Sequence, residues 1–157
     1  MELVVFIGLP ASGKSTFYQQ FFAHTHVCIS KDLLRNNRNK DRRQRQLIEE
    51  AFAAEKSVVV DNTHPSPEDR AQVIALAGAH GARVIGYYFR ASVAESVDRN
   101  SRREGKARVP DVAIFTAAKK LTRPSLDEGF DELLYVRMGL SNNFIVEPWK
   151  EDMTSGI

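Results

Sequence analysis

Residues 8–16, GLPASGKST, place a glycine-rich turn directly between an apolar strand and a helix. ELVVFI precedes the turn and FYQQFF follows it, so the chain changes from strand to helix over a few residues. Gly8, four further residues, Gly13, Lys14 and Ser15 form the pattern of a loop whose backbone N–H groups point at phosphate oxygens. The sequence therefore predicts a phosphate-binding loop (P-loop).

A nucleoside triphosphate fits this loop. Lys14 is expected to reach the β and γ phosphates, and Ser15 is expected to place its hydroxyl on a magnesium ion. A helix that begins near Lys14 adds the positive end of its dipole at the same place. We therefore predict binding of ATP, or another NTP, with Mg²⁺. The predicted nucleotide-binding residues of the loop are Gly8, Pro10, Ala11, Ser12, Gly13, Lys14, Ser15 and Thr16.

The chain has 157 residues, of which 43% are hydrophobic, and this suffices for a single domain with a buried core. We expect that core over residues 1–147 and a short tail over residues 148–157. Cys28 is the one cysteine of the sequence, so we expect neither an internal disulfide nor a disulfide-linked partner. The first residues lack the features of a signal peptide, and no apolar run approaches the roughly 20 residues that span a bilayer. These features predict a cytoplasmic protein with no membrane partner.

Positive charge is concentrated in two short blocks. Residues 35–45 carry a net charge of +5 and residues 99–108 a net charge of +4, in a chain whose formal net charge is +2. The rest of the chain is therefore acidic, a pattern that is typical of local anion binding. The alternative is that each block is a solvated helix face.

Strand-like and helix-like segments alternate along the chain. Helix starts are clearest at residues 66–69, where Ser66 stands at the N-cap and Pro67 at the first helical position. The expected strands are residues 2–7, 26–30, 56–61, 82–89, 131–138 and 142–147, and the expected helices are residues 41–55, 66–81 and 111–121 with one more from residue 92. This alternation predicts an α/β fold with a central parallel sheet that is covered by helices on both faces.

Ligands bind at the carboxyl ends of the strands in such a sheet. Two aspartates stand at predicted strand ends. Asp32 would accept a proton from an acceptor hydroxyl, and Asp61 would hold the magnesium shell together with Ser15. The alternatives are that Asp32 only caps the following LLRNN segment, and that Asp61 makes an Asx-turn in DNTHP.

The second basic block suggests a lid over about residues 95–110. Arg99 and Arg103 are four residues apart on one face of the predicted helix, where they would close over a triphosphate and neutralise transition-state charge. Gly105 would provide the hinge. His64 is interpreted as a turn residue rather than a catalytic base.

The order of these segments resembles the 5′-kinase domain of polynucleotide kinases. The likeness is carried by GLPASGKST, SKDLLR, VVVDNTHPSPEDR and DRNSRREGKARVPDVAIF with RPSLDEGFDEL, which cover most of residues 3–137. The resemblance implies a P-loop kinase fold with a helical arginine lid. It also implies that Asp32 is the general base, that Arg35 holds the phosphate next to the accepting nucleotide, and that Arg103 contacts the transferred phosphate. Asp61 matches the family's strand-end aspartate in DNT, which implies the alternative that Asp61 supports the lid arginine rather than magnesium. The chain departs from the family at Lys31, where an arginine is common.

The leading hypothesis is an ATP-dependent kinase that phosphorylates the 5′-hydroxyl end of DNA or RNA, with Lys14, Asp32 and Arg103 as catalytic residues. A polynucleotide offers several phosphates beyond its reacting end, which would suit the first basic block. The expected acceptor-binding residues are Arg35, Arg38, Arg42 and Arg43. Two alternatives stay open, namely a kinase for a small metabolite or sugar and an NTP-binding module without an acceptor.

Overall fold

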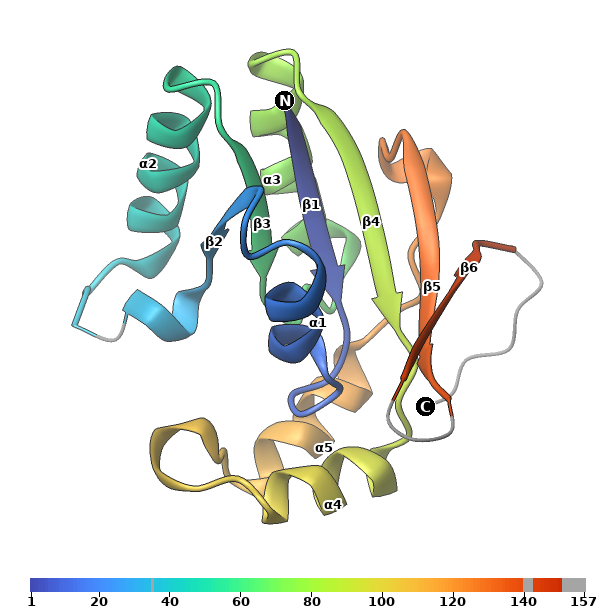
Figure 1. The fold of residues 1–157 in the computed structure, drawn as a ribbon. Coiled ribbons are helices and arrows are strands. Elements are labelled where there is room, and N and C mark those ends of the chain that lie inside the picture. The colour runs from blue at the N-terminus through green and yellow to red at the C-terminus, as the bar shows by residue number, and fades with distance from the viewer. Residues whose placement is uncertain (35, 140–142, 151–157) are drawn as a thin grey trace.

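The computed structural model describes residues 1–34, 36–139 and 143–150 (Figure 1). Arg35, which the sequence assigns to the acceptor, lies outside the described residues, as does most of the tail. One six-stranded sheet has the strand order β2-β3-β1-β4-β5-β6. Its strands are β1 (Glu2–Ile7), β2 (His26–Ile29), β3 (Ser57–Asp61), β4 (Arg83–Phe89), β5 (Glu132–Met138) and β6 (Phe144–Pro148).

The pairing is parallel from β2 to β5, as predicted. Val4 of β1 lies between Val59 of β3 and Ile85 of β4. The last strand differs, since β6 pairs antiparallel to β5, with Val146 opposite Val136. A parallel return needs a crossover of about a dozen residues or more, and the connection from β5 to β6 is too short for one.

Five α-helices and three short 3₁₀ turns connect the described strands. The helices are α1 (Lys14–Phe21), α2 (Lys40–Ala53), α3 (Pro67–Ala79), α4 (Val93–Ser101) and α5 (Asp111–Lys120). The turns are η1 (Lys31–Leu34), η2 (Gly105–Ala107) and η3 (Leu126–Glu128). The Ser66 side chain accepts the Asp69 N–H at the start of α3, which confirms the predicted cap.

The two faces of the sheet are covered by different helices (Figure 1). Leu3 and Val5 of β1 pack with Ile48 of α2 and Val73 of α3. The intervening side chains, Val4 and Phe6, pack on the other face with Phe17 of α1 and its neighbour Phe22. Residues 3–7 are fully buried, as expected for a strand that is covered on both faces.

The carboxyl ends of the parallel strands point toward α4 and α5, and the P-loop lies at the same edge (Figure 1). Ligands bind at the carboxyl ends of the strands in such a sheet, so we expect the ligand site at this edge. None of the helices in the described part of the chain is long and apolar enough to cross a membrane.

Candidate functional site

The P-loop is a tight turn between β1 and α1. Ala11 and Gly13 both have positive φ, at 61° and 99°, which is the left-handed conformation that occurs in anion-binding nests. The Gly8 N–H donates to the Thr63 carbonyl at 3.1 Å, so the loop is anchored to the segment after β3. No described side chain caps α1 at Gly13, and its first N–H groups are therefore available to a phosphate.

Lys14 is the first residue of α1 and is only 8% exposed. Its ammonium donates to the Gly8 carbonyl at 2.7 Å and to the Leu9 carbonyl at 2.9 Å. An ammonium has three donors, so one donor remains for a ligand. Burial lowers the pKa of Lys14 to about 8, although the nearby charges of Asp61 and Asp32 oppose this shift. A bound phosphate would favour the charged form.

Asp61 ends β3 and lies directly beside the P-loop. The Ser15 hydroxyl donates to its Oδ2 at 2.9 Å. Burial raises the pKa of Asp61, while the charge of Lys14, the hydrogen bond from Ser15 and the charge of Arg103 act in the opposite direction. This carboxylate–hydroxyl pair suits Mg²⁺, which takes one or two protein oxygens together with waters and substrate phosphates. Among the described residues, no group of three or more His, Cys, Asp and Glu side chains could hold a metal by itself.

Asp32 lies where two cavities meet. The larger cavity, of about 850 Å³, is lined by the P-loop and by Arg103. The smaller one, of about 300 Å³, is lined by Asp32 and by polar side chains such as Gln44 and His64. Four residues line both cavities, namely Asp32, Asn62, Thr63 and Pro65. Asp32 can therefore contact ligands in both.

Asp32 belongs to the short turn η1. Hydrogen bonds to two side chains, those of Ser30 and Asn62, hold this turn in place. Ser30 precedes the turn, and its hydroxyl accepts the Asp32 N–H at 3.2 Å. Asn62 Oδ1 accepts the Lys31 N–H at 2.9 Å, and Asn62 Nδ2 donates to Gln44 Oε1 at 2.7 Å. Asn62 thus links η1 to α2. The sequence analysis missed this bridge, because its two residues are 18 positions apart in the sequence.

His64 stabilises the turn after β3. It has a φ of 47° and is 4% exposed, and its Nδ1 lies 2.6 Å from the Phe6 carbonyl. Burial lowers the pKa of His64 to about 4, which keeps the ring neutral at pH 7, so Nδ1–H donates to that carbonyl. This geometry agrees with its interpretation as a turn residue.

The lid arginines are arranged differently from the prediction. Helix α4 ends at Ser101, so Arg103 lies beyond it and does not share a helix face with Arg99. The reason is the buried side chain of Asn100, which accepts the Val109 N–H at 3.0 Å and donates to the Val109 carbonyl at 2.6 Å, folding the chain back. Arg103 lines the P-loop cavity, and Arg99 is not among the residues that line it.

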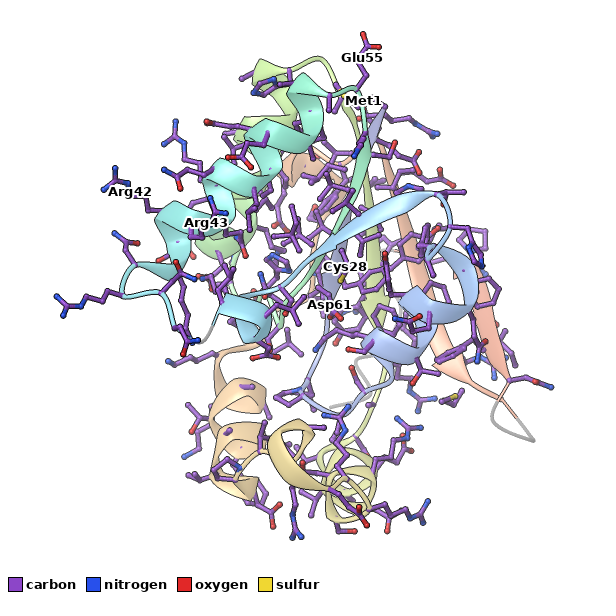
Figure 2. The ribbon with its side chains drawn as sticks, turned by 60° about the vertical axis from the view of Figure 1, so that its left-hand side comes forward. Met1, Cys28, Arg42, Arg43, Glu55 and Asp61 are labelled. Atoms are coloured by element: carbon purple, nitrogen blue, oxygen red, sulfur yellow. The ribbon has the colours of Figure 1, made fainter. Side chains whose placement is uncertain are left out.

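The predicted acceptor residues lie at different places around the start of α2. Arg38 is exposed before the helix. Arg42 points away from the body of the molecule and lines a groove between α2 and α3 (Figure 2). Arg43 instead donates to Gln46 at 3.4 Å and lies 3.9 Å from Glu50. None of the three lines the cavity beside Asp32.

A fully buried arginine, which the sequence analysis did not single out, supports the loop that follows β3. Arg70 of α3 donates to the His64 carbonyl at 2.9 Å and to the Thr122 carbonyl at 3.2 Å. It also forms an ion pair of 2.7 Å with Glu128. Arg70 therefore joins this loop to the segment that follows α5. A lone arginine in a helical pattern carries no sequence signal for such a role.

The sequence of this chain is similar to a protein family and to known proteins. A model of the AAA domain family matches residues 3–124. The bifunctional polynucleotide phosphatase/kinase of Schizosaccharomyces pombe is 29% identical over 133 residues, which are 82% of this chain and 32% of that protein. The chain spans about a third of the length of the curated relatives that it matches, whose shares are 32% and 36%.

Solved structures share the fold. The gluconokinase of Sinorhizobium meliloti has a TM-score of 0.61 at 19% identity, over 87% of this chain and 82% of that one. Kti12 of Chaetomium thermophilum, in complex with ADP-AlF3, has a TM-score of 0.65 at 18% identity, over 86% of this chain and 88% of that one. At such identities the likeness concerns the fold alone, and it confirms the predicted P-loop kinase fold.

Proposed function

The chain belongs to the AAA domain family, and on that premise we propose that it is an ATP-dependent kinase acting on the 5′-hydroxyl end of a polynucleotide. The observation that carries the proposal is the position of Asp32 between the P-loop cavity and a second cavity. A kinase needs an acceptor site next to its triphosphate site, with a carboxylate where the two meet. An NTP-binding module without an acceptor needs neither feature.

Each of the site residues would have a separate role in phosphoryl transfer. Lys14, the P-loop N–H groups and the start of α1 would hold the phosphates of ATP. Ser15 and Asp61 would hold Mg²⁺, which neutralises charge on the phosphate oxygens when it is bound. The 5′-hydroxyl oxygen attacks the γ-phosphorus, its proton passes to the Asp32 carboxylate, and the bond to the bridging oxygen breaks to release ADP. Arg103 would offset the negative charge that develops on the transferred group.

The polynucleotide acceptor is supported by the likeness to the Schizosaccharomyces pombe relative and by the basic start of α2. A kinase for a small metabolite or sugar is the second candidate. The cavity beside Asp32 is small, at about 300 Å³, and its carboxylates and carboxamides suit the hydroxyls of a polyol. The likeness of fold to a gluconokinase fits the same reading.

The experiment is an acceptor panel with γ-labelled ATP and Mg²⁺. The panel contains 5′-hydroxyl oligonucleotides of DNA and RNA, nucleosides, nucleoside 3′-monophosphates, and sugars that include gluconate. We expect label on the 5′ ends of oligonucleotides, with the highest kcat/KM among the acceptors tested. Label on a sugar, with none on any oligonucleotide, would establish the second candidate instead.

A further inference from the structure

A groove between α2 and α3 continues the cavity beside Asp32. The two spaces share Asp41, Gln44 and Gln72 in their walls, and the groove has a volume of about 560 Å³. Because that cavity also shares residues with the P-loop cavity, the three spaces adjoin one another from the P-loop past Asp32 to α2. An acceptor that is bound at Asp32 can therefore extend into the groove.

The two walls of the groove have different chemistry. The α2 wall carries Arg42 and Arg45, with Asn39 at its end. The α3 wall carries Gln72 where the groove meets the cavity and is otherwise apolar, with Val73, Ala75, Leu76 and Ala79. Guanidinium groups bind phosphates, whereas a low apolar wall leaves room for the flat face of a sugar or base. A chain of nucleotides presents both kinds of surface along its length.

The charges of the groove suit an anionic occupant. Asp41 is the acidic residue that lines the groove, and it forms an ion pair with Lys31. Arg45 is paired with Glu49 at 3.0 Å, but its side chain is 68% exposed. An exposed pair of this kind is weak, and a guanidinium has five donors, so Arg45 can also bind a phosphate.

We propose that the groove between α2 and α3 holds the nucleotides that follow the reacting 5′ end of a single strand. Their phosphates lie toward Arg42 and Arg45, and their sugars or bases lie against Ala75 and Ala79. This inference rests on the proposed polynucleotide kinase function and adds the path of the acceptor to it. It also replaces Arg43 by Arg45 in the set of acceptor-binding residues, because Arg45 lines the groove and Arg43 is not among the residues that line it.

One test fills the groove without changing its charge. Ala75→Trp places an indole in the groove, and Ala71→Trp is the control, since Ala71 is exposed on the same helix but does not line the groove. We compare kcat/KM for a 5′-hydroxyl octanucleotide with kcat/KM for a nucleoside 3′-monophosphate, and take the ratio. Ala75→Trp should lower this ratio about tenfold, the effect of roughly 1.4 kcal/mol of lost binding, and Ala71→Trp should keep the parent's ratio.

A second test removes one cation. Arg45→Ala should reduce the salt dependence of octanucleotide binding, measured by fluorescence anisotropy, by a slope of about 0.7 for one lost phosphate contact. Arg83→Ala is the matched control. Arg83 also forms an exposed pair of 3.0 Å, with Glu132, but it lies at the amino end of β4. The salt dependence of octanucleotide binding by Arg83→Ala should have the same slope as that of the parent.

The outcomes separate the two proposals. If the parent phosphorylates oligonucleotides but Ala75→Trp retains the parent's ratio, the path through the groove is wrong and the kinase function stands. Equal slopes for Arg45→Ala and Arg83→Ala would also contradict the path. If the parent phosphorylates no nucleic acid at all, the proposed function is wrong and the path is wrong with it.

Discussion

The Ser15 hydroxyl donates a hydrogen bond of 2.9 Å to Asp61 Oδ2, and this bond joins the first turn of α1 to the end of β3. The pair lies beside the buried ammonium of Lys14, whose charge influences the pKa of Asp61. Asp61 can therefore serve either the magnesium shell or Arg103, the arginine of the predicted lid, and the two roles give different measurable results.

We predict that Asp61→Asn weakens the dependence of ATP affinity on magnesium, because a carboxamide is a poorer ligand for a hard cation than a carboxylate. The measurement is the ATP Kd by calorimetry over a range of Mg²⁺ concentrations, in the parent, in Asp61→Asn and in Ser15→Ala. Ser15→Ala should show the same weakening. If Asp61→Asn has the parent's magnesium dependence and only a lower kcat, then Asp61 supports Arg103 instead.

The lowered pKa of Lys14 predicts that ATP binding takes up a proton in alkaline solution. Free Lys14 has a pKa of about 8, so above this pH much of it is neutral. Bound phosphates favour the ammonium and raise this pKa, so near pH 9 binding should take up close to one proton, about what a single group can contribute. Calorimetry in buffers of different ionisation enthalpy measures the uptake. Lys14→Ala should lose both the uptake and phosphoryl transfer, whereas a variant with near-normal turnover would refute the assignment.

The buried, neutral ring of His64 predicts a loss of stability in acid. Its pKa is about 4 in the folded protein and 6.5 in the unfolded chain, so the unfolded chain binds the proton first as the pH falls. The stability that the neutral ring provides is therefore complete above pH 6.5 and is lost as the pH falls toward 4. The loss should be about 3 kcal/mol, from 1.36 kcal/mol for each pKa unit.

The comparison for His64 is His64→Asn, since asparagine tolerates a positive φ and its amide can donate to the Phe6 carbonyl. Urea unfolding at pH 7 and at pH 4 gives the free energy of unfolding of each protein. The parent should lose about 3 kcal/mol more than His64→Asn over this interval. Equal losses in the two proteins would mean that His64 is not held neutral by burial.

Removal of Arg70 should destabilise the whole domain. Arg70→Met leaves Glu128 without its cation and two loop carbonyls without their donor, which should cost about 3–5 kcal/mol of unfolding free energy. Arg70→Met combined with Glu128→Gln should recover part of this loss, because no unpaired carboxylate remains. The measurement is urea unfolding at pH 7, with Arg83→Ala as the exposed control. A loss below 1 kcal/mol in Arg70→Met, about the value of a surface pair, would contradict this role.

The sequence predicted the parts of the fold that depend on neighbouring residues. The strand before Gly8, the helix after Gly13 and the Ser66 cap are each encoded within a few positions. The parallel sheet followed from the alternation of strands and helices. The direction of β6 could have been predicted too, since so short a connection after Met138 leaves no room for a crossover.

The remaining features depend on contacts between distant residues. Asn62 bonds to Gln44 across the gap between the loop after β3 and α2, and Asn100 ends α4 early through its bonds to Val109. Neither pair has a local sequence signal, because an asparagine at either position would also suit a turn or an exposed helix surface. The prediction that Arg99 and Arg103 share one helix face was wrong for this reason. The roles of the other predicted site residues stay predictions.

The most direct test of the kinase mechanism is Asp32→Asn, measured for both phosphoryl transfer and ATP binding. If Asp32 accepts the proton of the acceptor hydroxyl, the variant should lose about 10²–10⁴-fold in kcat. Its Kd for ATP with Mg²⁺ should stay within about twofold of the parent, since no nucleotide contact is removed. The opposite result, a collapse of ATP affinity together with kcat, would identify Asp32 as a metal or structural residue and contradict its position as the base between donor and acceptor.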